Sequence, residues 1–325
     1  MIGILIAALL WGTTGTAATL LPPGVGPVAI GASTMLIGGI GLVLTAWGPT
    51  VSVLRDRTAR RILLPGALAT AVYPLAFYAA MSEAGVAVGN VVALGTAPLF
   101  AALLERVVEP AATRPSFTPR WGISAALAIL GVTLLALFGH GSEGEDAGSV
   151  ARDTGSLILG ITLALLAGLS YAGYTVTAGR LMREGHSSRG VMAAQFGLAG
   201  VVLLPVLALT IGPALTVTTY APDSPLGTLV TGTLGPLPPL VPLLYLALGP
   251  MMLAYLAFGR GLRTVPGSRA TTITLLEPFT ATVLAIVAVG ERLGPMGFLG
   301  LGIVLAGVVL AATERGSPGR PTRQR

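Results

Sequence analysis

The sequence contains no cysteine and no lysine, and its only histidines are His140 and His186. Without cysteine, the chain cannot form disulfides, thiolate metal sites or a thiol nucleophile. Charged residues make up only 10% of its 325 residues, whereas a soluble domain has about 25%. So few charges could not cover the surface of a soluble protein of this length, so the composition excludes that class.

Motifs typical of enzymes are also missing. The sequence has no Gly-x-x-x-x-Gly-Lys phosphate loop, no His-Glu-x-x-His metal motif and no Gly-x-Ser-x-Gly nucleophile turn. Both histidines fall in polar connections, so none lies in an apolar segment where it could activate a serine. We therefore expect no enzymatic activity, no resident metal and no cofactor.

Apolar residues dominate what is present: 53% of the chain is hydrophobic, and the mean hydropathy is +0.84. Apolar runs of helical length predict an all-α integral membrane protein with ten spans. The start, MIGILIAALLWG, lacks a basic n-region and reads as the first span rather than a signal peptide. The predicted spans cover residues 2–21, 27–47, 62–81, 85–104, 120–139, 155–177, 190–212, 239–259, 267–289 and 294–312.

The 19 basic residues, all arginine, are distributed unevenly between the joints of these spans. Only Arg152 and Arg292 fall on one side of the predicted membrane, and all the others fall on the opposite side. Arginine is enriched in cytoplasmic loops, so both termini are predicted to be cytoplasmic. The net charge of +6 then reflects membrane topology, and nucleic acid is not an expected partner.

The two halves of the chain resemble each other. A shift of 180 positions places Pro98 of GTAPLF on Pro278 of LLEPFT, and LLWGTTGTA (9–17) resembles LSYAGYTVT (169–177). Each half has five spans, an odd number, so the second half must enter the membrane from the opposite side. This pattern predicts an inverted repeat, an arrangement associated with alternating-access transporters.

The layout resembles the drug/metabolite transporter superfamily in its ten-span EamA-type branch. The resemblance is carried by AALLWGTTG (7–15) and by LLEPFTATVLAIVAVGERLGPMGFLGLGIVLAGVVL (275–310), with its proline, its turn Gly290-Glu291-Arg292 and its glycine-rich last helix. It implies two five-helix repeats, at 1–139 and 155–312. Between and after them lie an acidic external linker at 140–154 and a basic cytoplasmic tail at 313–325.

The function expected from this resemblance is secondary transport of a small organic metabolite across the plasma membrane. The substrate would be an amino acid, an amine or a drug-like compound, carried by alternating access. Export is favoured over uptake, and the proton is one candidate coupling ion. The alternative is a passive channel or facilitator for a small solute. The expected partners are the substrate and the lipid bilayer, with a second copy of the chain as one option.

Glu277 is the leading candidate for a functional residue because it lies in the middle of span 267–289. An ionisable group at that depth costs roughly 2.5 kcal/mol or more on insertion scales. It could bind a cationic group or exchange a proton in a central cavity. Alternatively, it could act structurally beside Pro278, which leaves the carbonyl of Thr274 without its helical donor.

Further candidates lie inside the predicted spans. Pro98 and Pro278 could kink two related helices so that they act as gates, or could be ordinary membrane prolines. Polar and aromatic residues could line a cavity formed by spans one, three, four, six, eight and nine, or could pack between helices. These candidates for substrate or proton binding are Trp11, Tyr73, Tyr78, Asn90, Tyr171, Tyr174, Tyr255 and Thr274.

Two other features are expected to be structural. Glu105 and Arg106 lie at a helix end and are predicted to be solvated or snorkelling charges. The small residues Gly160, Ala164, Gly168 and Ala172 recur every four positions, which predicts close packing along one helix face.

Overall fold

The computed structural model describes residues 1–22, 24–109, 117–138, 154–221, 225–289 and 293–313. Within these ranges every regular element is a helix, apart from an isolated antiparallel bridge between Tyr220 and Leu237. The predicted all-α class is therefore confirmed. Three predicted features fall largely or wholly outside the described residues: the acidic linker up to residue 153, the turn at 290–292, and the tail from residue 314.

The first half of the chain forms helices α1 (Ile2–Gly12), α2 (Thr14–Ala18), α3 (Pro27–Thr45), α4 (Trp47–Arg55), α5 (Arg57–Ala84), α6 (Val86–Val108) and α7 (Pro119–Phe138). The second half forms α8 (Thr154–Arg183), α9 (Ser188–Val202), α10 (Leu204–Thr210), α11 (Gly212–Thr216), α12 (Pro225–Leu234), α13 (Leu240–Leu246), the π-helix η2 (Ala247–Leu253), α14 (Ala254–Leu262), α15 (Gly267–Ile273), α16 (Leu276–Leu284), the π-helix η3 (Ala285–Val289) and α17 (Pro295–Ala312).

Eight helical segments in the described residues are long and apolar enough to cross a membrane. The pair α9–α10, bent by 49°, passes the same test as a ninth, whereas Ile2–Ala18, formed by α1 and α2, is a shorter apolar segment. Each of the ten predicted ranges is thus occupied by helix. The structure establishes a multi-pass membrane protein with eight or nine candidate spans by length and composition.

Several helices extend beyond their predicted ends. The third predicted span, 62–81, lies within α5, which starts at Arg57 because Asp56 caps it. One carboxylate oxygen of Asp56 accepts hydrogen bonds from the backbone N–H groups of Thr58, at 2.7 Å, and Ala59, at 3.2 Å. These hydrogen bonds lower the pKa of Asp56 below its ordinary value, and the bond from Ala59 contributes most.

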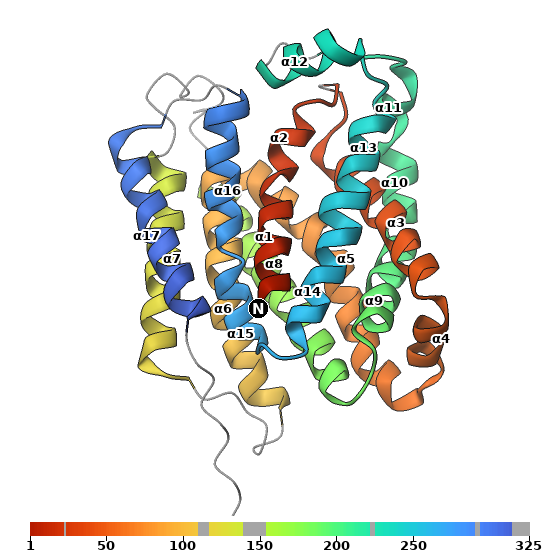
Figure 1. Ribbon diagram of the computed structural model, residues 1–325, viewed down its shortest axis with the longest axis vertical. Coiled ribbons are helices and arrows are strands. Elements are labelled where there is room, and N and C mark those ends of the chain that lie inside the picture. Colours follow the sequence, from red (N-terminus) through yellow and green to blue (C-terminus); the bar gives the residue numbers. More distant parts are fainter. Residues whose placement is uncertain (23, 110–116, 139–153, 222–224, 290–292, 314–325) are drawn as a thin grey trace, which may run out of the picture.

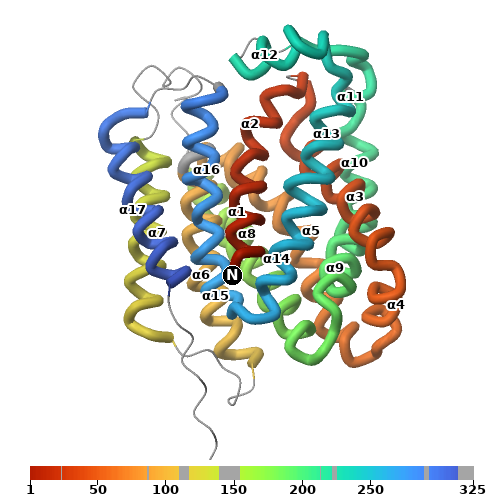
Figure 2. Tube along the Cα trace, in the orientation of Figure 1, coloured from red at the N-terminus to blue at the C-terminus, as the bar shows by residue number. Residues whose placement is uncertain are grey.

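The long helices stand side by side, and helices that follow each other in the chain, such as α14 and α15, run in opposite directions (Figures 1 and 2). Chain reversals from α4 to α5, from α8 to α9 and from α14 to α15 all lie toward the lower end of Figure 1, and the N-terminus lies in the lower half of the same view. These reversals carry most of the arginines that the sequence assigned to one side, so the described basic joints gather at one end of the bundle. That end is called the basic end below.

Small residues allow the helices to approach closely. A Cβ atom on Gly160 would lie 2.4 Å from the backbone nitrogen of Ala84, and one on Gly168 would lie 2.7 Å from the carbonyl oxygen of Ala93. The predicted small-residue face of α8 is therefore confirmed as a packing face, against α5 and α6. Between α7 and α17, Gly131 has the same role, since its Cβ would meet the Val304 nitrogen at 2.4 Å.

Candidate functional site

The helix that carries Glu277 is broken in the middle of its span. Thr274 and Leu275 form a turn between α15 and α16, and Pro278 is the third residue of α16. The Glu277 backbone N–H donates to the Thr274 carbonyl at 2.9 Å, which supplies the donor that Pro278 lacks. Glu277 therefore lies in the first turn of α16, where the helix dipole favours a negative charge.

The matching proline of the first half behaves differently. Pro98 is buried inside α6, and this helix runs through it without interruption. The sequence shift aligns the two prolines, but in this conformation only Pro278 is accompanied by a break in the helix.

Glu277 faces a cavity of about 170 Å³ between the helices. The lining residues come from α1, α2, α3, α5, α8, α13, η2, α14 and α16. Helix α3 thus takes part in the lining, whereas no described residue of α6, the fourth predicted span, is among the lining residues. Span four was predicted to line the cavity, but span two lines it instead.

Seven of the predicted candidates line this cavity: Trp11, Tyr73, Tyr78, Tyr171, Tyr174, Tyr255 and Glu277. Thr274 does not line it but is buried directly behind it, bonded to Tyr171. Asn90 lies on α6 and is outside the lining. Sequence reasoning missed Thr14, Ile30, Gly31, Thr34, Met35, Pro74, Phe77, Leu246, Pro250 and Met251.

Aromatic rings form a continuous series around the cavity. Centroids of consecutive rings lie between 4.9 and 6.2 Å apart, within the usual range for interacting aromatic pairs. The series runs Trp11, Tyr255, Tyr174, Tyr171, Tyr73, Phe77 and Tyr78. The wall of the cavity is therefore largely made of ring faces and edges.

Several polar groups in this wall are already used within the protein. Trp11 Nε1 donates to the carbonyl of Pro250 at 2.9 Å, and Tyr174 and Tyr255 share a hydroxyl–hydroxyl bond of 3.1 Å. Thr274 donates to the Thr271 carbonyl, so in the 2.6 Å contact with Tyr171 the tyrosine is the donor. These bonds fix the orientation of the rings.

The Glu277 carboxylate has no hydrogen-bond or ion-pair partner among the described residues. No basic residue lines the cavity either. A carboxylate held among rings without a cation is costly in a low-dielectric interior. Such an arrangement is suited to receive a positive charge from outside the protein.

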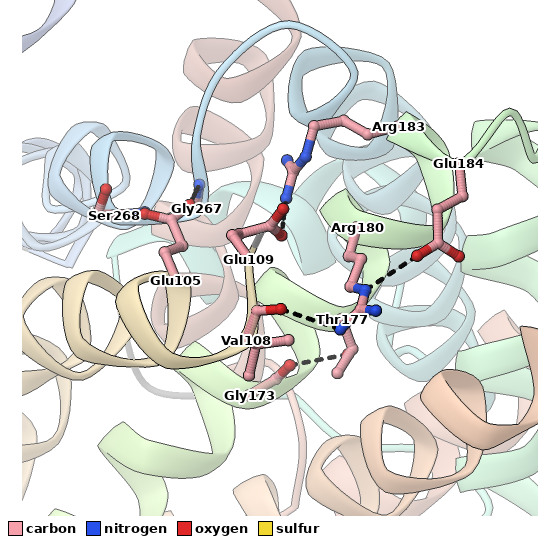
Figure 3. A network of polar contacts seen from close by, with 10 residues as sticks. All are labelled: Glu105, Val108, Glu109, Gly173, Thr177, Arg180, Arg183, Glu184, Gly267 and Ser268. Carbon is pink, nitrogen blue, oxygen red and sulfur yellow. Dashed lines mark hydrogen bonds and ion pairs between the residues drawn. The ribbon is translucent and has the colours of Figure 1, made fainter. Parts of the chain in front are cut away.

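A second polar cluster lies at the basic end (Figure 3). Glu105, at 0% exposure, accepts hydrogen bonds from the backbone N–H groups of Gly267 and Ser268, and so caps α15 from the end of α6. The expectation that Glu105 is a solvated or snorkelling charge is therefore wrong. The neighbouring helix end supplies the N–H groups that satisfy the buried carboxylate, a contact that the local sequence does not indicate.

Ion pairs extend this cluster to α8. Arg183 binds Glu109, which is itself buried, while Arg180 donates to the carbonyl of Val108 at 3.1 Å and pairs with Glu184 at 2.9 Å (Figure 3). The ends of α6, α8 and α15 are thus joined by charged groups at the basic end.

A bundle of membrane-length apolar helices around a small cavity with an intramembrane carboxylate is the architecture of a membrane transport protein. The chain belongs to the EamA-like transporter family, whose model matches residues 1–137 and 158–313. This confirms the resemblance inferred from the sequence and agrees with the expectation that the chain is not an enzyme.

Two individual proteins extend this comparison. The chain is 34% identical over 314 residues to a Bacillus subtilis (strain 168) protein described as "Uncharacterized transporter YwfM", with 96% of this chain and 93% of that protein covered. A crystal structure of another protein shares the fold, with a TM-score of 0.71, 20% identity and 95% of each chain covered.

Proposed function

We propose that the chain is a secondary transporter that moves a small organic metabolite by alternating access, in the direction of export. In this proposal the bundle has ten spans in two inverted five-helix repeats, at 1–139 and 155–312. Helices α1 and α2 together form the first span, and α9 with α10 forms the seventh. A second copy of the chain remains an optional partner.

The packing of the helices supports the inverted repeat. In the proposed repeat, α1 corresponds to α8, α5 to α14 and α6 to α16. The contact between α5 and α8 then corresponds to that between α1 and α14, and the contact between α6 and α8 to that between α1 and α16. All four contacts are present. The contacts α3–α9 and α7–α17 join counterparts directly and map onto themselves. Contacts that exchange in pairs, or that join counterparts directly, are expected for two repeats related by a two-fold axis.

The gathering of arginine-bearing joints at one end supports a cytoplasmic location for that end and for both termini, with the protein in the plasma membrane. Because the natural chain has no cysteine, a single introduced cysteine reports its side of the membrane. Labelling of Arg263→Cys from outside intact cells by an impermeant reagent would contradict this orientation.

The single observation that carries the proposal is Glu277 in its cavity. One carboxylate among rings holds one positive charge at a time, so a bound proton and a cationic substrate would exclude each other there. This competition would couple export of the substrate to entry of protons. No ATP-binding motif is present in the sequence to supply energy instead.

Flux in proteoliposomes tests the proposal. A confirmed substrate is expected to move faster when a pH gradient of the right sign is imposed, and Glu277→Gln is expected to remove that dependence, while Glu184→Gln, at the basic end, keeps it. Flux indifferent to both the gradient and Glu277→Gln would exclude coupling at this residue.

The alternative, a passive channel, needs a continuous polar path through the bundle. The described polar groups are instead scattered, and buried ones such as Thr70 and Gln195 hydrogen-bond to each other within the bundle, which favours a binding site over a continuous path. Electrical currents far above carrier turnover would reverse this choice.

A further inference from the structure

The charges that face the cavity are of one sign. Among its lining residues Glu277 is the only carboxylic acid, and neither arginine nor histidine contributes. The described arginines of α4, α5, α8, α14 and α15 lie toward helix ends rather than in the cavity. A single negative charge in low dielectric is best matched by a single positive charge on the ligand.

The ring series adds a second preference for a cation. Trp11, Tyr73 and Tyr171 line the same cavity as Glu277, and ring faces attract ammonium groups within about 6 Å of their centroids. Because carboxylate and rings belong to one cavity, a bound ammonium group can form an ion pair and cation–π contacts together.

The hydrogen-bonding groups distinguish an amine from an amino acid. The Trp11 N–H is used by Pro250, and the Thr34 hydroxyl donates to the Ile30 carbonyl at 2.8 Å. Neutral hydroxyls such as those of Tyr73 and Tyr78 remain. A substrate carboxylate would therefore be buried near Glu277 with no cation to balance it, which is unfavourable.

Size and polarity complete the description of the ligand. The cavity, about 170 Å³, is smaller than the roughly 300–1,000 Å³ of sites for drug-sized molecules. Its lining also includes the apolar side chains of Ile30, Met35, Leu246 and Met251. These surfaces fit a short apolar body.

We infer that the Glu277 cavity binds a small organic monocation, a protonated amine with an apolar body and no carboxylate. This inference rests on the proposed function and names the substrate class of the same site. Of the three classes that the sequence left open, it selects the amines over amino acids and larger drug-like compounds.

The test is calorimetric binding to the purified protein with matched ligands. The amines are 2-phenylethylamine and n-butylamine. Three further compounds are matched to 2-phenylethylamine: phenylalanine has an added carboxylate, 2-phenylethanol has no charge, and 3-phenylpropionate has a negative charge in place of the positive one. We expect at least one amine to bind, with phenylalanine weaker than 2-phenylethylamine by about tenfold or more and the other two compounds weaker still.

Variants link the preference to the site. Glu277→Gln is expected to weaken amine binding by about 30-fold or more, whereas Glu184→Gln, whose carboxylate lies in an exposed pair with Arg180, leaves it unchanged. An unchanged circular dichroism spectrum and melting temperature for Glu277→Gln show that the loss is not due to misfolding.

Two kinds of failure can be told apart. If phenylalanine or 3-phenylpropionate binds as well as the amine, if neither amine binds, or if Glu277→Gln binds the amine normally, the substrate class is wrong, and transport of another compound would still stand. If the amine binds as expected but shows no carrier flux in liposomes, the proposed function fails while the ligand class holds.

Discussion

At the scale of single residues, Glu277 and Trp11 illustrate what the sequence can and cannot indicate. A carboxylate in the middle of an apolar run is visible as an unusual cost, and so Glu277 could be predicted as a candidate. The absence of a hydrogen-bond or ion-pair partner for Glu277 could not be predicted, because the fold decides which side chains lie near the carboxylate. Trp11 was a candidate for substrate contact, and the structure adds a specific bond to it.

Replacing Trp11 by phenylalanine is expected to destabilise the protein. Its Nε1–H donates to the Pro250 carbonyl within the π-helix η2, and removing the donor leaves a buried acceptor unsatisfied at a cost of about 1–3 kcal/mol. Unfolding in a mixed-micelle denaturant titration measures this loss. Trp47→Phe is the control, since Trp47 is 64% exposed; an equal loss in both variants would contradict the assignment.

At the scale of helices, the positions of the apolar segments could be predicted because run length and polar joints depend only on local sequence. The break at Thr274–Leu275 was signalled by Pro278, yet Pro98 leaves α6 intact, so proline alone does not decide where a membrane helix is interrupted. The contribution of α3 to the cavity could not be foreseen, since Gly31, Thr34 and Met35 carry no signal separable from ordinary packing.

Glu105→Ala is expected to loosen the junction between α6 and α15. The substitution leaves the N–H groups of Gly267 and Ser268 without the carboxylate that caps them, and the expected loss of unfolding free energy is about 1–3 kcal/mol. Glu184→Ala, which breaks only the exposed pair with Arg180, is expected to cost about 0.5 kcal/mol or less. The same denaturant titration compares them, and equal losses would contradict a capping role for Glu105.

At the scale of the whole molecule, the family and the helical class followed from the sequence because both reside in patterns spread along the chain. The enclosure of one carboxylate by rings from widely separated segments is a property of the assembled bundle. Trp11, Tyr73, Tyr171 and Tyr255 come from four helices that lie far apart in the sequence. Only the tertiary packing shows that their rings line one cavity with Glu277.

The central claim, that Glu277 holds the substrate of a carrier, is tested most directly by counterflow. Liposomes containing the protein are loaded with an unlabelled amine that binds to it, then diluted into a trace of the labelled amine. An alternating-access carrier is expected to accumulate label transiently inside, and Glu277→Gln is expected to abolish this accumulation while Glu184→Gln preserves it. Label uptake that is independent of the internal amine, or unaffected by Glu277→Gln, would contradict the account.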